Sequence, residues 1–158
     1  MGIFLTVLPL AVGGAAAVLT MDAMAQYSAL PQPPFASPAW VFPAVWTVLY
    51  LLMGAASRRV HRLGTQESRN ALMLYYVQLA VHFVWPLLYF RAQEYAVAFW
   101  WLLLLLALVL AALSAFSRLD KAAGRLLMPY AAWLLFAAYL NYSMMRMAQT
   151  NMPNAAEM

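Results

Sequence analysis

Long stretches without a charged side chain are the feature that most constrains the fold of this chain. Five of them, each 18 to 23 residues long, contain no Asp, Glu, Lys or Arg, and they cover residues 2–21, 40–57, 71–90, 95–117 and 126–145. A hydrocarbon core about 30 Å thick is crossed by roughly 20 apolar residues in a helix. Transmembrane strands instead alternate apolar and polar residues in segments of about ten, which the run from Trp100 to Leu106 does not do. We therefore expect an all-α membrane protein, a bundle of five transmembrane helices.

The composition excludes the soluble and disordered classes. Hydrophobic residues make up 66% of the 158 residues and charged residues only 9%, against roughly a quarter in an ordinary soluble domain. A soluble domain of this size leaves about a third of its chain area in water and has no place for so much apolar surface. The chain has no cysteine, which excludes disulfides, thiolate metal sites and cysteine nucleophiles.

The basic residues lie between the predicted spans. Seven of the nine fall in the second and fourth connections: Arg58, Arg59, Arg62, Arg69, Arg118, Lys121 and Arg125. The first connection contains Asp22 and no basic residue, and the third has Arg91 balanced by Glu94. By the positive-inside rule the second and fourth connections face the cytoplasm of an energised inner membrane, with the amino terminus inside and the carboxyl terminus outside. We interpret these clusters as determinants of topology, and no nucleic acid is expected as a partner.

The first connection, residues 22–39, is the longest. Its prolines, at positions 31, 33, 34 and 38, favour a stiff, extended backbone. Its apolar side chains, Tyr27, Leu30 and Phe35, suit a lid folded onto the bundle, and a loop lying against lipid headgroups is equally expected. Residues 1–148 are thus predicted to form one membrane domain with 22–39 as its lid. Residues 64–70 are expected to form a solvated turn and the polar tail 149–158 to fray.

Residues 3–20 have a second interpretation as a secretory signal. They are followed by Ala23, Met24 and Ala25, which form a small-x-small cleavage pattern. They lack the positively charged start of such signals and are long enough to span, so we expect a retained helix.

Polar side chains inside the spans are scarce. Gln78 and His82 lie four residues apart in the third span, on one face with Tyr75 and Trp85. In the fifth span Asn141 shares a face with Trp133 and Ala137. Such groups must point inward, because an unpaired polar group in hydrocarbon costs several kcal/mol. They either hydrogen-bond between helices, each bond contributing about 1 kcal/mol, or line a ligand cavity, and polarity alone favours the first alternative.

Aromatic side chains at mid-span favour a cavity. Trp46, Trp133 and His82 fall near the middle of their spans, away from the interfacial belts where Trp and Tyr usually lie. Inward rings suit flat, apolar ligands, whereas Trp100 and Trp101 are more simply expected to fill the core or face lipid.

Prolines and small residues in the spans predict helix bends and close helix contacts. Pro9 and Pro86 are expected to bend their helices. Gly13 and Ala17 form a small-xxx-small pattern for close packing or dimerisation.

The chemistry absent from the spans excludes other classes. None carries a carboxylate, Lys or Arg in its interior, so ion-coupled transporters and charged filters are disfavoured. His82 alone does not make a metal site, since catalytic zinc needs three protein ligands. It is one conceivable axial haem ligand, but a hydrogen bond to a neighbouring helix is the stronger expectation. No catalytic triad or phosphate-binding glycine loop is present, so no catalytic residues are assigned.

Three stretches of the sequence resemble those of one known family of membrane proteins. Residues 33–54, PPFASPAWVFPAVWTVLYLLMG, resemble the family's proline-rich loop and second helix. Gln78-Leu79-Ala80 with Trp85-Pro86 resembles its third helix. Residues 127–133, LMPYAAW, with Phe136-Ala137 and Leu140-Asn141-Tyr142, resemble its fifth. These matches occur in order over about residues 27–146, and the family that they resemble is the TspO family of tryptophan-rich sensory proteins and mitochondrial translocator proteins (peripheral benzodiazepine receptors).

The resemblance implies a five-helix bundle that often dimerises and holds a cavity under the first loop. Family members bind porphyrins, haem and benzodiazepine-type ligands and, in the mitochondrial branch, cholesterol. By position, the pocket-lining residues would be Tyr27, Trp46, His82, Trp133 and Ala137. With the inward groups of the spans, the candidate ligand-binding residues are Tyr27, Trp46, Tyr50, Gln78, His82, Trp85, Trp133, Ala137 and Asn141. Leu140, Tyr142 and Arg146 match a proposed cholesterol pattern.

The chain departs from the family at three positions: Gln26 and Phe35 stand where Trp is usual, and His82 where Asn is usual. The function expected is membrane binding of tetrapyrroles and cholesterol, as a sensor, carrier or scavenger, with porphyrin or haem as ligand and no obligatory cofactor. The alternative is an enzyme that degrades porphyrin with light and oxygen, a reaction attributed to the loop Trp that Gln26 replaces. A bacterial membrane is expected, with the mitochondrial outer membrane as the alternative.

Overall fold

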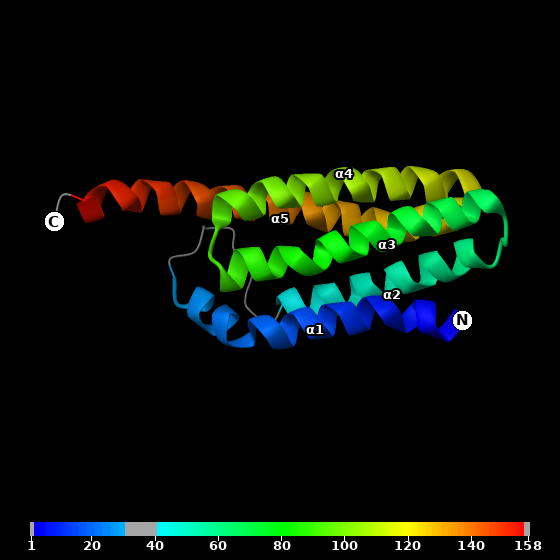
Figure 1. The fold of residues 1–158 in the computed structure, drawn as a ribbon, viewed down its shortest axis with the longest axis horizontal. Helices are drawn as coiled ribbons and strands as arrows, with labels where there is room; N and C mark the ends of the chain where they lie inside the picture. Colours follow the sequence, from blue (N-terminus) through cyan, green and yellow to red (C-terminus); the bar gives the residue numbers. More distant parts are fainter. Residues whose placement is uncertain (1, 31–40, 157–158) are drawn as a thin grey trace.

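The computed structural model describes residues 2–30 and 41–156, and that part of the chain is almost entirely helical. It contains five α-helices and one π-helical turn: α1 (Gly2–Ser28), α2 (Val41–His61), α3 (Gln66–Pro86), η1 (Leu87–Arg91), α4 (Tyr95–Leu119) and α5 (Lys121–Ala156). Figure 1 shows the helices side by side along one direction, with successive helices running in opposite senses. The prediction of an all-α fold is confirmed for the described residues.

Four stretches in the described ranges are long and apolar enough to cross a membrane: Ile3–Ala23, Gln66–Arg91, Tyr95–Leu119 and Lys121–Thr150. The described part of α2 is not among them. The fifth crossing, expected over residues 40–57, therefore stays a prediction.

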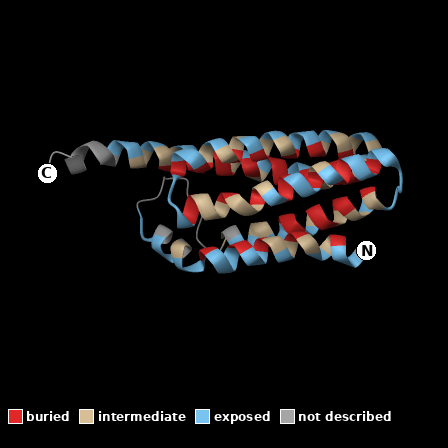
Figure 2. Cartoon of the chain, viewed as in Figure 1, coloured by how far each residue is buried: buried red, intermediate tan, exposed pale blue. Residues whose placement is uncertain are grey.

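The outer surface of the bundle has the character of a lipid-facing surface. Buried residues follow the inner faces of the helices and exposed ones the outer faces (Figure 2). Large apolar side chains on the outside include Ile3, Met73 and Trp100, which are 77%, 68% and 67% exposed. Such surface is unfavourable in water, at about 25 cal/mol per Å², whereas acyl chains solvate it. Burial thus supports a multi-pass membrane protein.

Two glycines let α1 and α2 approach closely. A Cβ atom at Gly13 would overlap the ring of Tyr50, and one at Gly54 would overlap the backbone of Thr6. Gly14, the neighbour of Gly13, has no atom within 4 Å of its Cβ position. Gly13 therefore serves packing within one chain, and a role of this helix in dimerisation stays a prediction.

Three helix ends differ from the expected boundaries. The connection predicted from residue 22 begins later, since α1 continues to Ser28. The solvated turn expected over 64–70 is shorter, because Thr65 caps α3 by accepting a hydrogen bond from the Ser68 amide (3.1 Å). The tail expected to fray from residue 149 continues α5 to Ala156. The polar composition of these stretches misled the prediction, since polar side chains such as Gln and Asn are compatible with a helix. Residues 31–39 of the predicted lid lie outside the described residues.

The third helix changes its geometry directly after Pro86. The five residues of η1, Leu87–Arg91, have π-helical hydrogen bonding, and π turns are frequently found at functional sites. A bend was predicted at Pro86, and this is where the α-helix ends.

The two basic connections meet at one end of the bundle. In Figure 1 the α2–α3 and α4–α5 connections lie at the same end as the amino terminus. Arg59, in the last turn of α2, pairs with Asp120 between α4 and α5, with 2.9 Å between Nε and Oδ2. The arginine beside it holds the pKa of the Asp120 carboxyl below its ordinary value.

Candidate functional site

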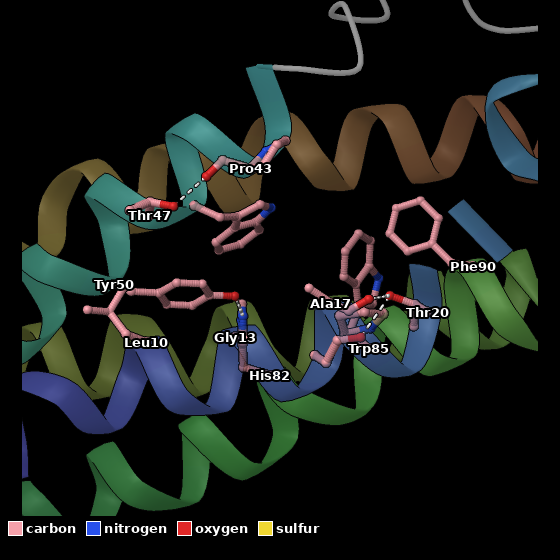
Figure 3. Close-up of a pocket in the computed structure, with 14 residues that line it drawn as sticks. Leu10, Gly13, Ala17, Thr20, Pro43, Thr47, Tyr50, His82, Trp85 and Phe90 are labelled. Atoms are coloured by element: carbon pink, nitrogen blue, oxygen red, sulfur yellow. Dashed lines mark hydrogen bonds between the residues drawn. The ribbon is translucent and has the colours of Figure 1, made fainter. Parts of the chain in front are cut away.

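A cavity of about 230 Å³ lies between α1, α2 and the end of α3 (Figure 3). Its walls are mostly apolar, with aromatic rings from α2 and α3 and small side chains from α1. The lining residues are Leu10, Gly13, Gly14, Ala16, Ala17, Thr20, Pro43, Trp46, Thr47, Tyr50, His82, Trp85, Pro86 and Phe90.

His82 joins three helices at the wall of this cavity. Its Nε2 atom lies 2.9 Å from the hydroxyl of Tyr50 on α2, the contact drawn in Figure 3. Its Nδ1 atom lies 3.0 Å from the hydroxyl of Tyr130 on α5. That hydroxyl also donates to Oε1 of Gln78, one turn before His82 on α3 (3.0 Å). These four side chains, Tyr50, His82, Tyr130 and Gln78, form the histidine network.

The direction of donation in the histidine network follows from the Gln78 carbonyl. Tyr130 has one hydroxyl hydrogen and gives it to Gln78, so it must accept from Nδ1–H of His82. A neutral imidazole carries only one N–H, so Nε2 accepts from the hydroxyl of Tyr50. Each of these contacts then has one donor and one acceptor. Both ring nitrogens of His82 are thereby used by the protein itself.

Trp46 places an aromatic wall over the histidine network. Its ring stacks on that of Tyr50, with centroids 5.6 Å apart and planes at 23°. It meets the ring of His82 edge-on at 4.8 Å and that of Trp133 at right angles at 6.4 Å. Rings from α2, α3 and α5 are thus held in fixed mutual orientations.

A second polar link connects α3, α4 and α5. The indole Nε1 of Trp85 donates to Oδ1 of Asn141 on α5 (3.1 Å), and Nδ2 of Asn141 donates to the carbonyl oxygen of Tyr95 on α4 (2.8 Å). Asn141 is buried, so this link satisfies an amide that would otherwise be costly in hydrocarbon. Trp85 lines the cavity, whereas Asn141 is not among the lining residues and fixes the position of the Trp85 indole.

The predicted site residues do not all meet at the cavity. Trp46, Tyr50, His82 and Trp85 line it. Gln78, Ala137 and Asn141 are buried but are not among its lining residues. The side chain of Tyr27 lies outside the described residues.

Trp133 lies in a separate groove on the outside of the bundle. This groove, of about 600 Å³, runs between α2 and α5 and is lined by Ala44, Val45, Val48, Leu49, Leu52, Pro129, Ala132 and Trp133. Trp133 thus contacts the ring of Trp46 but is not among the residues that line the cavity between α1, α2 and α3.

The residues of the expected cholesterol pattern separate onto two sides of α5. Leu140 is 5% exposed and Tyr142 is 41% exposed. Arg146 lies one turn beyond Tyr142 and donates to its hydroxyl (3.4 Å). Only Tyr142 and Arg146 thus share an accessible face.

Two contributions to the site were not predicted from the sequence. Tyr130 bridges His82 and Gln78, although its position in the quoted stretch LMPYAAW marked it only as part of a resemblance. The small residues of α1 were interpreted as a packing surface, whereas Gly14, Ala16 and Ala17 also line the cavity. In the part of the chain that the structure describes, no three His, Asp or Glu side chains gather as a metal site would require.

Comparison with known proteins identifies what the chain is similar to. The family model described as TspO/MBR family matches residues 5–147. The tryptophan-rich protein TspO of Chlorobaculum tepidum is 34% identical over 143 residues, 87% of this chain and 89% of that protein. The tryptophan-rich sensory protein of Cereibacter sphaeroides is 38% identical over 82% of this chain and 80% of its own length. The translocator protein of Homo sapiens is 38% identical over 76% and 73%.

Proposed function

Since this chain belongs to the TspO/MBR family, we propose that it binds a tetrapyrrole, a porphyrin or haem, and acts in the membrane as a sensor, carrier or scavenger of that ligand. The observation that carries the proposal is the aromatic wall of the cavity, where Trp46 stacks on Tyr50 beside His82. The names of the relatives, sensory protein and translocator protein, agree with sensing or transport.

The polar groups around the cavity favour a ligand held by its apolar faces. Thr20 donates to the carbonyl of Ala16 (2.8 Å) and Thr47 to that of Pro43 (2.7 Å). His82 and the indole N–H of Trp85 are used within the protein. A ligand here gains most from ring contact and from burial of apolar area.

The volume of the cavity limits how much of a macrocycle enters it. An apolar cavity of about 150 Å³ takes one benzene, so about 230 Å³ suits one edge of a tetrapyrrole. We propose that this edge lies against Trp46 while the remaining rings stay outside the helical walls.

The histidine network predicts that iron contributes little to affinity. Both nitrogens of His82 are hydrogen bonded to tyrosines, so an axial bond to haem iron would have to break one of these contacts. Protoporphyrin and haem should therefore bind with similar affinity, and His82→Ala should leave the visible spectrum of bound haem unchanged. A spectrum typical of histidine-ligated haem that is lost in His82→Ala would contradict this part of the proposal.

Titration of the detergent-purified protein tests the binding site. Haem, protoporphyrin and cholesterol are titrated side by side into the wild type, Trp46→Ala and Trp100→Ala. Trp100 is a matched control because its indole is 67% exposed on the outer face of α4. Loss of the Trp46 ring should weaken porphyrin affinity about tenfold, or about 1.4 kcal/mol, whereas Trp100→Ala should have no effect. Equal affinities for the three proteins would exclude this cavity.

Illumination separates a binding protein from a porphyrin-degrading enzyme. Bound protoporphyrin is illuminated with and without oxygen, beside a protein-free control. If the chain only binds protoporphyrin, the bound protoporphyrin should bleach as it does in the protein-free control. A new chromophore that requires both protein and oxygen would support the enzyme instead.

We extend the proposal to cholesterol through Tyr142 and Arg146. They form one exposed face of α5, with the Arg146 guanidinium 6.0 Å from the centre of the Tyr142 ring. Saturable sterol binding should be lost in Tyr142→Ser and kept in Tyr139→Ser, a control at a tyrosine of the same helix that is 49% exposed. Sterol binding that survives Tyr142→Ser would remove the basis for this site.

A further inference from the structure

Positive charge is concentrated at one end of the bundle. Seven basic and two acidic residues lie in or beside the α2–α3 and α4–α5 connections, a formal charge of +5. We call this set the basic end: Arg58, Arg59, Arg62, Glu67, Arg69, Arg118, Asp120, Lys121 and Arg125. The cavity lies toward the other end, since it is lined by the beginning of α2 and the end of α3.

Most of these cations have no counter-ion in the protein. Arg59 takes the carboxylate of Asp120, and Arg69 donates to the side chain of Gln66 and to the carbonyl of Gly64. Within the described ranges, no hydrogen bond or ion pair is made by the side chains of Arg58, Arg62, Arg118, Lys121 and Arg125. All of these except Arg58 are exposed.

Arg58 is the most informative member of the basic end. Its Nε atom is shielded from solvent and donates to no acceptor of the described chain. Arg58 lies one turn after Gly54, the residue of α2 that touches Thr6 of α1, so it belongs to the α1-facing side of α2. A shielded guanidinium donor costs free energy unless an anion accepts from it.

We propose that the basic end binds the phosphate headgroup of an anionic phospholipid. A guanidinium offers paired N–H donors that match the oxygens of a phosphate. The position selects lipid as the source of the anion, because Arg118 and Lys121 lie at the junction of the spans Tyr95–Leu119 and Lys121–Thr150. At such junctions a bilayer presents its headgroups.

Native mass spectrometry of the detergent-purified full chain tests this proposal with phosphatidylglycerol and phosphatidylcholine as probes. The test variant is Arg62→Gln with Arg125→Gln. The control is Arg91→Gln with Arg146→Gln, which removes the same charge at the opposite end. Affinity for phosphatidylglycerol should fall about 30-fold in the test variant, which is about 2 kcal/mol at roughly 1 kcal/mol for each cation. The control should keep the wild-type affinity.

Three further measurements distinguish the sources of the anion. Preference for phosphatidylglycerol over phosphatidylcholine should decline with added salt, because exposed charges are screened, and Arg58→Gln should weaken it by itself. Inorganic phosphate or a short RNA at equal concentration should not displace the lipid. Equal binding of the two lipids, equal losses in the two double variants, or displacement by phosphate or RNA would each overturn the proposal. The tetrapyrrole titration is independent of these outcomes, since it depends on the cavity at the other end.

Discussion

A methyl group at Gly13 should push the ring of Tyr50 away from His82. The Cβ of an alanine here would overlap that ring, and the backbones of α1 and α2 are already close. The ring carries the hydroxyl that donates to Nε2 of His82. Gly13→Ala should therefore disturb the packing of two helices and the histidine network together.

The expected size of the effect follows from three contributions. Overpacking a tight site costs about 1–3 kcal/mol, and losing one hydrogen bond inside a membrane protein costs about 1 kcal/mol. Replacing glycine by alanine in a helix returns up to about 1 kcal/mol. Gly14→Ala gains the same propensity without the overlap, since nothing lies within 4 Å of its Cβ position. The two variants should thus differ in free energy of unfolding by about 2–4 kcal/mol, with Gly13→Ala the less stable.

Denaturant titration in mixed detergent micelles measures this difference, and a Tyr50→Ala background identifies its cause. Without the ring, the cost of Gly13→Ala should disappear and the two glycine positions should respond alike. If Gly13→Ala is as stable as Gly14→Ala, or if its cost persists in the Tyr50→Ala background, the assigned contact between α1 and α2 is wrong.

Two more predictions concern hydrogen bonds and charge. Tyr130→Phe removes the bridge between α3 and α5 and should lower the free energy of unfolding by about 1–2 kcal/mol, against nearly no change for Tyr76→Phe, at a tyrosine of α3 that is 38% exposed. Because the pKa of Asp120 is lowered, chiefly by its hydrogen bond from Arg59, its contribution to stability is present above its ordinary pKa of 3.8 and lost as the pH falls below that value. This surface pair contributes less than about 1 kcal/mol, so unfolding curves recorded between pH 6 and pH 3 should show a small loss. Arg59→Gln should reduce that loss without abolishing it, because the amides of Ala122 and Ala123 also donate to Asp120; an equal loss in Arg59→Gln would contradict the prediction.

Hydropathy and polarity predicted the helices and the inward placement of His82 and Asn141, because an amide or imidazole in hydrocarbon must find a partner. They did not predict that Tyr130 is a partner of His82, since a pattern along one helix does not determine how that helix is rotated against its neighbour. Trp133 shows the same limit. It follows Tyr130 by three residues, so the two side chains point only about 60° apart around the helix, yet Trp133 lines the outer groove while Tyr130 points inward.

The hydrogen bonds of the histidine network can run in either of two directions. In the direction deduced above, the hydroxyl of Tyr50 donates to His82, and the carbonyl oxygen of Gln78 is the last acceptor. A molecule in the cavity that accepted this hydrogen would leave Nε2 of His82 without a donor. Every atom of the network would then be satisfied only if each remaining hydrogen bond reversed its direction and the amide of Gln78 turned over. Binding of such a molecule beside α2 would thus change the orientation of the Gln78 side chain on α3, next to α5, without a movement of any helix.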